Sequence, residues 1–294
     1  MKDDPDMANY KYSHFLWVNV AVLFIATSAP LGRYLSLAPP LAIWCRSLVG
    51  LLALAVVIKG LKHPFQLPWR SLGGPVVLSG VLLGLHWITY FYSLSVAGVA
   101  VGVLSLFTYP LLIAVLEPLV FKTPLQVRHL FFALLALVGV YVMVPSFDLA
   151  NESLQGVLWG VVSALCFAIR NLLMKKHIVG YPGTTLMFYQ LVVIVLTFWP
   201  VFLVWDAAPL QTDWPWLLVL GLITTAAGHT LFVMSFRHFT VSTVGILSSL
   251  QPIFGILLGW VFLSEVPPRN AILGGSIILV VAVIEAVLAG MRRA

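Results

Sequence analysis

Four polar side chains recur at helical spacing in one apolar segment of the chain. Ser79, His86, Tyr90 and Ser93 are separated by seven, four and three positions, which places them on one face of an α-helix. Imidazole, phenol and hydroxyl groups provide both donors and acceptors, so this face is suited to bind the polar part of a small molecule. The alternative for His86 is a buried histidine that only hydrogen-bonds to a neighbouring helix.

A corresponding segment further along the chain carries an apolar version of this face. When the two halves of the chain are aligned in one register without gaps, the equivalent face consists of Gly221, Gly228, Phe232 and Ser235. A cavity between the two faces would have hydrogen-bonding groups on one wall and an apolar surface opposite, which favours a ligand with one polar and one apolar end. His229 aligns with Trp87 instead of His86, so it ranks below His86 as a candidate.

Two prolines, Pro110 and Pro252, are equivalent in the same register. Proline removes a backbone hydrogen bond within a helix and frees a carbonyl group. We therefore expect the neighbouring Tyr109 and Gln251 to line the same cavity, and the paired kinks to act as gates. Kinks with a purely architectural role are the alternative.

Motifs of the common enzyme classes are absent from the sequence. There is no GxxxxGK[ST], HExxH or GxSxG motif, and every aspartate lies outside the apolar segments. The sequence therefore predicts no enzymatic activity, no cofactor and no metal site. Proton coupling would have to use His86, His229 or a glutamate near a helix end.

The composition predicts a membrane protein. Of the 294 residues, 61% are hydrophobic and 9% are charged, and the mean hydropathy is +1.04. A soluble domain is about half apolar and about a quarter charged. The net charge of +6 is scattered over short loops, so no nucleic-acid partner is expected. The sequence predicts ten transmembrane helices, at residues 14–33, 40–59, 74–95, 98–121, 128–144, 155–175, 184–205, 214–236, 240–263 and 270–290.

Three further residues inside these segments are candidates for the cavity. Arg46 would bind a carboxylate if it is buried, and would snorkel to the bilayer surface otherwise. Trp17 and Trp159 occupy equivalent positions and are predicted to line the cavity, with the aromatic belt at the membrane interface as the alternative. Arg170, by contrast, is predicted to be paired or snorkelling near a helix end.

Basic residues predict the orientation. With the N-terminus in the cytoplasm, twelve of the sixteen Lys and Arg fall on the cytoplasmic side, and only Arg33 and Arg269 fall outside. The positive-inside rule then predicts that both termini are cytoplasmic, in a bacterial inner membrane.

The chain divides into two related halves. In the single register used above, Trp17 aligns with Trp159 and Pro110 with Pro252. The predicted repeats are residues 1–150, with five helices, and 151–294, with the other five. Because five is odd, the second repeat must be inserted upside down, an arrangement typical of secondary transporters.

The sequence from Leu250, LQPIFGILLGWVFLSEVPPRNAILGGSIILVVAVI, combines a proline, a glutamate at the helix end and a glycine-led last helix. The first half has TYPLLIAVLEPLVFKTPL and an arginine within AIWCRSL. These segments resemble the EamA repeat of the drug/metabolite transporter superfamily, and the chain is most similar to the YddG-type exporters of aromatic and other amino acids. The resemblance implies a ten-helix basket around a central cavity. In the first half, Lys122-Thr123 replaces the acidic residue of the repeat.

These features favour a secondary transporter that exports amino acids or similar amphipathic metabolites by alternating access. Its expected partners are a small-molecule substrate and the lipid bilayer. An exporter of drugs or cationic toxins is the first alternative, although no acidic residue lies at the centre of a predicted helix. A receptor or enzyme subunit that transports nothing is the second.

Overall fold

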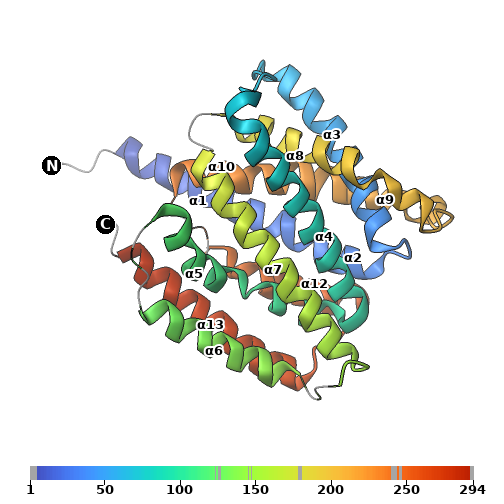
Figure 1. Ribbon diagram of the computed structural model, residues 1–294, viewed down its shortest axis with the longest axis vertical. Coiled ribbons are helices and arrows are strands. Elements are labelled where there is room, and N and C mark those ends of the chain that lie inside the picture. The colour runs from blue at the N-terminus through green and yellow to red at the C-terminus, as the bar shows by residue number, and fades with distance from the viewer. Residues whose placement is uncertain are drawn as a thin grey trace.

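The computed structural model describes residues 5–122, 124, 127–144, 146, 148–177, 181–239, 244 and 247–291, and these residues form helices and no strand (Figure 1). The first half of the chain contains α1 (Pro5–Ala26), α2 (Ser28–Tyr34), α3 (Pro39–Gly60), α4 (Trp69–Leu106), α5 (Tyr109–Phe121) and α6 (Val127–Met143). The second half contains α7 (Glu152–His177), α8 (Gly183–Phe198), η2 (Trp199–Leu203), α9 (Leu210–Val219), η3 (Leu220–His229), α10 (Thr230–His238), α12 (Leu250–Leu263) and α13 (Arg269–Met291).

Six helical segments within the described residues are long and apolar enough to cross a membrane. Four shorter apolar helices accompany them: Tyr109–Phe121, Leu130–Met143, Leu250–Leu263 and Arg269–Ile284. The difference from the ten predicted spans has more than one origin. The predicted span 98–121 is interrupted by a turn at Phe107 and Thr108, and the predicted span 240–263 includes residues 240–243, 245 and 246, which lie outside the described part.

Helix α4 is two helices joined at a sharp turn. Gly98 has φ +84° and ψ 173°, outside the helical region and accessible mainly to glycine. A Cβ atom on Gly102 would lie 3.2 Å from the backbone nitrogen of Leu94, whereas eight residues of straight helix span about 12 Å. The chain therefore folds back at Gly98, where the sequence predicts the boundary between two spans.

Glu265 holds this turn from the other half of the chain. Its Oε1 accepts a hydrogen bond from the Val99 amide at 2.6 Å, and its carboxylate lies 3.8 Å from the Nε of Arg33. Arg33 in turn donates to the Ser95 carbonyl at 2.9 Å. Because the first amides of a helix lack intrahelical partners, the carboxylate caps the helix that restarts after Gly98.

The two halves pack against each other throughout the bundle. Helix α4 contacts α7, α3 contacts α8, and α1 contacts η3 and α10. Helices α6 and α13 lie side by side along one edge of the molecule (Figure 1). Glycine permits this last contact, since a Cβ on Gly274 would lie 2.3 Å from the carbonyl oxygen of Gly139.

Backbone geometry recurs in the register that aligns Pro110 with Pro252. Helices α5 and α12 end at Phe121 and Leu263, and the next residues, Lys122 and Ser264, are both left-handed, with φ of 54° and 55°. The helices that follow begin at Val127 and Arg269, which are equivalent in the same register. The ends of these helices therefore recur in the same register that aligns the two halves of the sequence.

Candidate functional site

A small cavity lies between the halves, lined by helices of both. It has a volume of about 10 Å³, room for about one water molecule. Its wall combines hydrogen-bonding and aromatic side chains from both halves: Ile25, Ser28, His86, Trp87, Tyr90, Leu106, Phe167, His229, Phe232 and Gln251. Three residues predicted from the sequence, His86, Tyr90 and Gln251, are therefore brought together here.

His86 lines this cavity and also bonds to a neighbouring helix. Its Nδ1 lies 2.7 Å from the Ser163 hydroxyl, which donates a hydrogen bond of 2.8 Å to the His86 carbonyl. The imidazole stacks on Phe167, with 4.4 Å between ring centroids, and lies parallel to Tyr90 at 6.1 Å. The two alternatives raised by the sequence, cavity lining and a helix-to-helix bond, thus coexist in one side chain.

Arg46 is fully buried beside the cavity and does not snorkel. Its Nε donates to the Thr225 hydroxyl at 3.0 Å and its Nη1 to the Ser28 hydroxyl at 3.2 Å. The guanidinium carbon lies 4.4 Å from the centroid of the Trp87 ring, in cation–π geometry. These contacts tie α3 to α2 and η3 and hold the charge next to the cavity wall.

His229, which the sequence ranked below His86, and Trp87, which it did not propose, both line the cavity. Their rings meet edge to face with centroids 5.0 Å apart. They align with each other in the register that relates the two halves, so they are equivalent residues of the two repeats. Their alignment in one register is the signal by which the pair could have been found.

Arg170 is also fully buried, contrary to the prediction that it is paired or snorkelling near a helix end. Its three nitrogens have neutral partners, namely Gln190 Oε1 at 2.9 Å, Asn171 Oδ1 at 3.0 Å and Met187 Sδ at 3.7 Å. The described residues that line the cavity do not include it.

The core carries positive charge without a nearby acid. Among the described residues, Asp213 is the one buried carboxylate. Its Oδ2 accepts hydrogen bonds of 2.8 Å from the amides of Ser36 and Leu37, at the end of α2. No described residue of the cavity wall is acidic.

Three predicted residues on helix faces lie away from the cavity. Ser93 donates to the Gly156 carbonyl at 2.6 Å, in the tight contact between α4 and α7. Trp159 is 40% exposed and stacks on Tyr92, on the outside of the bundle. Trp17 is 54% exposed and lines a separate recess with α10 and Phe239. In this structure, therefore, neither tryptophan lines the cavity.

Tyr109 and the two prolines lie next to the cavity, at restarted helices. Tyr109 is buried against Phe167, with ring centroids 5.0 Å apart, and hydrogen-bonds to Ser248. Pro110 is the second residue of α5 and Pro252 the third residue of α12. Each proline thus follows a helix break instead of kinking a continuous helix, because a first turn does not need its amide.

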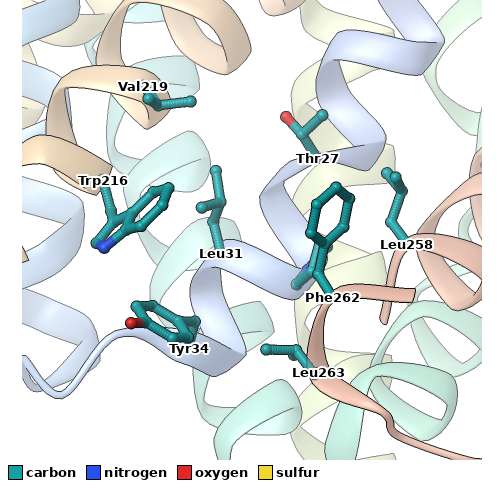
Figure 2. Close-up of a pocket in the computed structure, with 9 residues that line it drawn as sticks. Thr27, Leu31, Tyr34, Trp216, Val219, Leu258, Phe262 and Leu263 are labelled. Carbon is teal, nitrogen blue, oxygen red and sulfur yellow. The ribbon is translucent and has the colours of Figure 1, made fainter. Parts of the chain in front are cut away.

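A larger groove lies elsewhere, between α2, α9 and α12, with a volume of about 320 Å³ (Figure 2). Phe262, Tyr34 and Trp216 at its rim are exposed. The hydroxyl of Thr27 is engaged with the Phe24 carbonyl and Thr224. The groove offers an apolar surface and no charged side chain, so it is not the candidate site for a polar solute.

Relatives of known function are transporters. A threonine/homoserine exporter of Salmonella typhimurium is 24% identical over 263 residues, 85% of this chain and 85% of the relative. A pseudopaline exporter of Pseudomonas aeruginosa is 24% identical over 216 residues, 72% of this chain and 74% of the relative. An S-adenosylmethionine uptake transporter of Rickettsia prowazekii is 20% identical over 206 residues, 69% of this chain and 68% of the relative.

A solved crystal structure of a protein has the same fold, with a TM-score of 0.69 at 20% identity over 95% of this chain and 99% of the other. The model of the EamA-like transporter family matches two stretches of equal length, residues 13–144 and 154–285. Since these two matches cover most of the sequence, the chain belongs to the EamA-like transporter family.

Proposed function

We propose that this transporter exports amino acids or similar amphipathic metabolites by alternating access, through the central cavity. The observation that carries the proposal is the composition of the cavity wall. Imidazole, phenol and amide groups from His86, Tyr90 and Gln251 face the aromatic rings of Phe167 and Phe232. Such a wall suits a solute with a polar and an apolar end, because each buried polar group of the solute needs a partner.

The proposal includes ten membrane spans in two inverted repeats, 1–150 and 151–294. The contacts between helices support it. The contact of α1 with η3 and α10 joins the first predicted span to the eighth, and the contact of α4 with α7 joins the third to the sixth. A twofold rotation that exchanged the two repeats would turn the first of these contacts into the second. It would leave the contacts α3–α8 and α6–α13 unchanged. The start of α1 and the end of α13 also lie toward the same end of the bundle (Figure 1).

A cavity for about one water cannot hold an amino acid, so binding requires the helices to part. The helix breaks before Pro110 and Pro252 lie next to the wall and supply two points at which helices could bend. We therefore propose that α5 and α12 move against α4 and α7 when the cavity opens to either side.

Two observations favour amino acids over cationic drugs. The described part of the cavity wall has no acid that would pair with a cation, whereas Arg46 brings a positive charge to its edge. Two of the relatives named above are exporters, which supports an outward direction of transport, and one is an uptake transporter.

The test uses the purified chain in liposomes loaded with a mixed pool of amino acids. Time-dependent loss of particular amino acids from the lumen, absent from protein-free liposomes, is the expected result. Efflux should need no nucleotide, because the sequence lacks a P-loop. Efflux of cationic dyes but of no amino acid would favour the multidrug alternative, and no flux of any solute would favour a protein that does not transport.

A further inference from the structure

Two buried polar atoms beside the central cavity have no hydrogen-bond partner: Arg46 Nη2 and His229 Nδ1. Both side chains are at most 2% exposed, and both contact the Trp87 ring. Leaving a buried polar group unpaired costs about 1–3 kcal/mol, and more if the group is charged. Unpaired groups that are buried beside a cavity are therefore expected to bind a ligand when the cavity holds one.

The rest of the Arg46 guanidinium is held in place. Nε and Nη1 are bound to Thr225 and Ser28, and the Trp87 and Phe91 rings lie 4.4 and 5.6 Å from its central carbon. The Thr225 hydroxyl is itself committed to the Leu220 carbonyl at 2.9 Å. The guanidinium is thus oriented by neutral groups, and Nη2 is the nitrogen left for a ligand.

The charge also lacks a counter-ion. Asp213, the buried acid among the described residues, is occupied by two backbone amides, and no described residue of the cavity wall is acidic. A buried charge without a partner is strongly unfavourable. An anionic group on the solute would remove this penalty and satisfy Nη2 by the same contact.

We propose that Arg46 and His229 form the subsite for the carboxylate of the transported solute. The inference rests on the proposed function, and it narrows the substrate class to small carboxylates with an apolar tail, amino acids among them. The carboxylate would accept a hydrogen bond from Arg46 Nη2 and a second from His229 when Nδ1 carries its proton. The tail would face Phe167 and Phe232, which line the same cavity.

Arg170 provides a matched control within the same protein. It is as buried as Arg46, and neutral groups bind all three of its side-chain nitrogens. Losing it should lower stability without changing which solutes bind, because none of its three partners lines the cavity, whereas Arg46 contacts the lining residues Ser28 and Trp87.

The experiment measures ligand-induced thermal stabilisation of the purified full-length protein. The probes are L-threonine, L-leucine and L-phenylalanine, the amide of each, and 4-methylpentanoate, which is leucine without its amino group. For the wild type we expect the acids, 4-methylpentanoate included, to stabilise and the amides to fail. For Arg46→Gln we expect the apparent affinity for acids to fall about tenfold or more, the amount that a lost charged hydrogen bond predicts. Arg46→Lys should recover part of it.

Each variant is compared with its own ligand-free melting temperature, so a loss of stability does not obscure the result. Arg170→Gln should melt earlier but keep the wild-type preference for acids over amides. The inference is overturned if amides stabilise as well as acids, if no carboxylate probe stabilises the wild type, or if Arg46→Gln keeps the preference. If Arg46 binds acids but the protein produces no flux in liposomes, only the proposed function is contradicted. If Arg46→Gln transports like the wild type, only this inference is contradicted.

Discussion

His86 combines a place in the cavity wall with a bond to Ser163, and two substitutions separate these contributions. Ser163→Ala removes the hydroxyl that lies 2.7 Å from Nδ1 but leaves the imidazole in the wall. His86→Ala removes both. Hydrogen bonds between membrane helices contribute about 0.6 kcal/mol on average, so Ser163→Ala should lose little stability. His86→Ala also removes a buried ring that stacks on Phe167, so it should lose more.

Flux should distinguish the two variants. We expect His86→Ala to reduce flux per folded molecule sharply and Ser163→Ala to leave it near the wild-type value. Thermal stability and flux are measured on the same preparation, normalised to the folded fraction. Normal flux in His86→Ala would show that the histidine is structural.

The residues of the site were predictable in part. Helical spacing found His86 and Tyr90, because residues three and four apart share a face whatever the surroundings. The same rule placed Ser93 on that face, although the face is divided between the cavity and the α4–α7 contact. The contact between Trp87 and His229 depends on how two distant helices meet, and spacing within one segment does not contain that information.

At the scale of helices, the turn at Gly98 depends on a carboxylate from the other half. Glu265→Ala removes the acceptor of the Val99 amide and the partner of Arg33. Loss of a helix cap costs about 1 kcal/mol, while the exposed ion pair contributes little. We expect a lower melting temperature for Glu265→Ala.

Glu265→Gln is the control, because its amide oxygen can still accept from Val99 while its charge is lost. It should keep most of the stability if the cap is the larger contribution. Equal losses in both variants would instead assign the effect to the ion pair with Arg33. A circular-dichroism melt of the three proteins makes the comparison.

Pro110 and Pro252 test whether the helix breaks serve gating. Alanine at either position restores an amide hydrogen and favours a continuous helix through the break. We expect each variant to fold and to transport roughly several-fold more slowly, because opening then requires breaking a hydrogen bond that the wild type lacks. Flux per folded molecule is the measurement.

Pro118 is the matched control for this test. It lies buried inside α5 and does not follow a helix break. Pro118→Ala should transport like the wild type. Wild-type flux in Pro110→Ala and Pro252→Ala as well would make the breaks purely architectural.

Helix positions were predictable from apolar runs, but helix continuity was not. Thr27 and Thr108 lie at two breaks, and each donates its hydroxyl to the carbonyl three residues earlier, at 2.6 and 2.9 Å. Such bonds compete with the helical pattern. Because threonine also occurs within helices, its presence alone does not predict a break.

At the scale of the whole molecule, the distribution of basic residues predicts that both termini are cytoplasmic. Reporter fusions at residue 294 and in the loop 206–209, just before α9, should lie on opposite sides of the membrane. A reporter active only in the cytoplasm should respond at residue 294, and one active only outside should respond in the loop. Reporters on the same side would contradict the inverted repeat.

The central cavity has a consequence for the energy stored across the membrane. The cavity has room for about one water molecule, and a proton path through water would need a continuous chain of several. Under the proposed mechanism, a cavity this narrow between transport steps would therefore limit proton leakage along the solute's route. Such a transporter would leave the proton gradient intact even at high copy number.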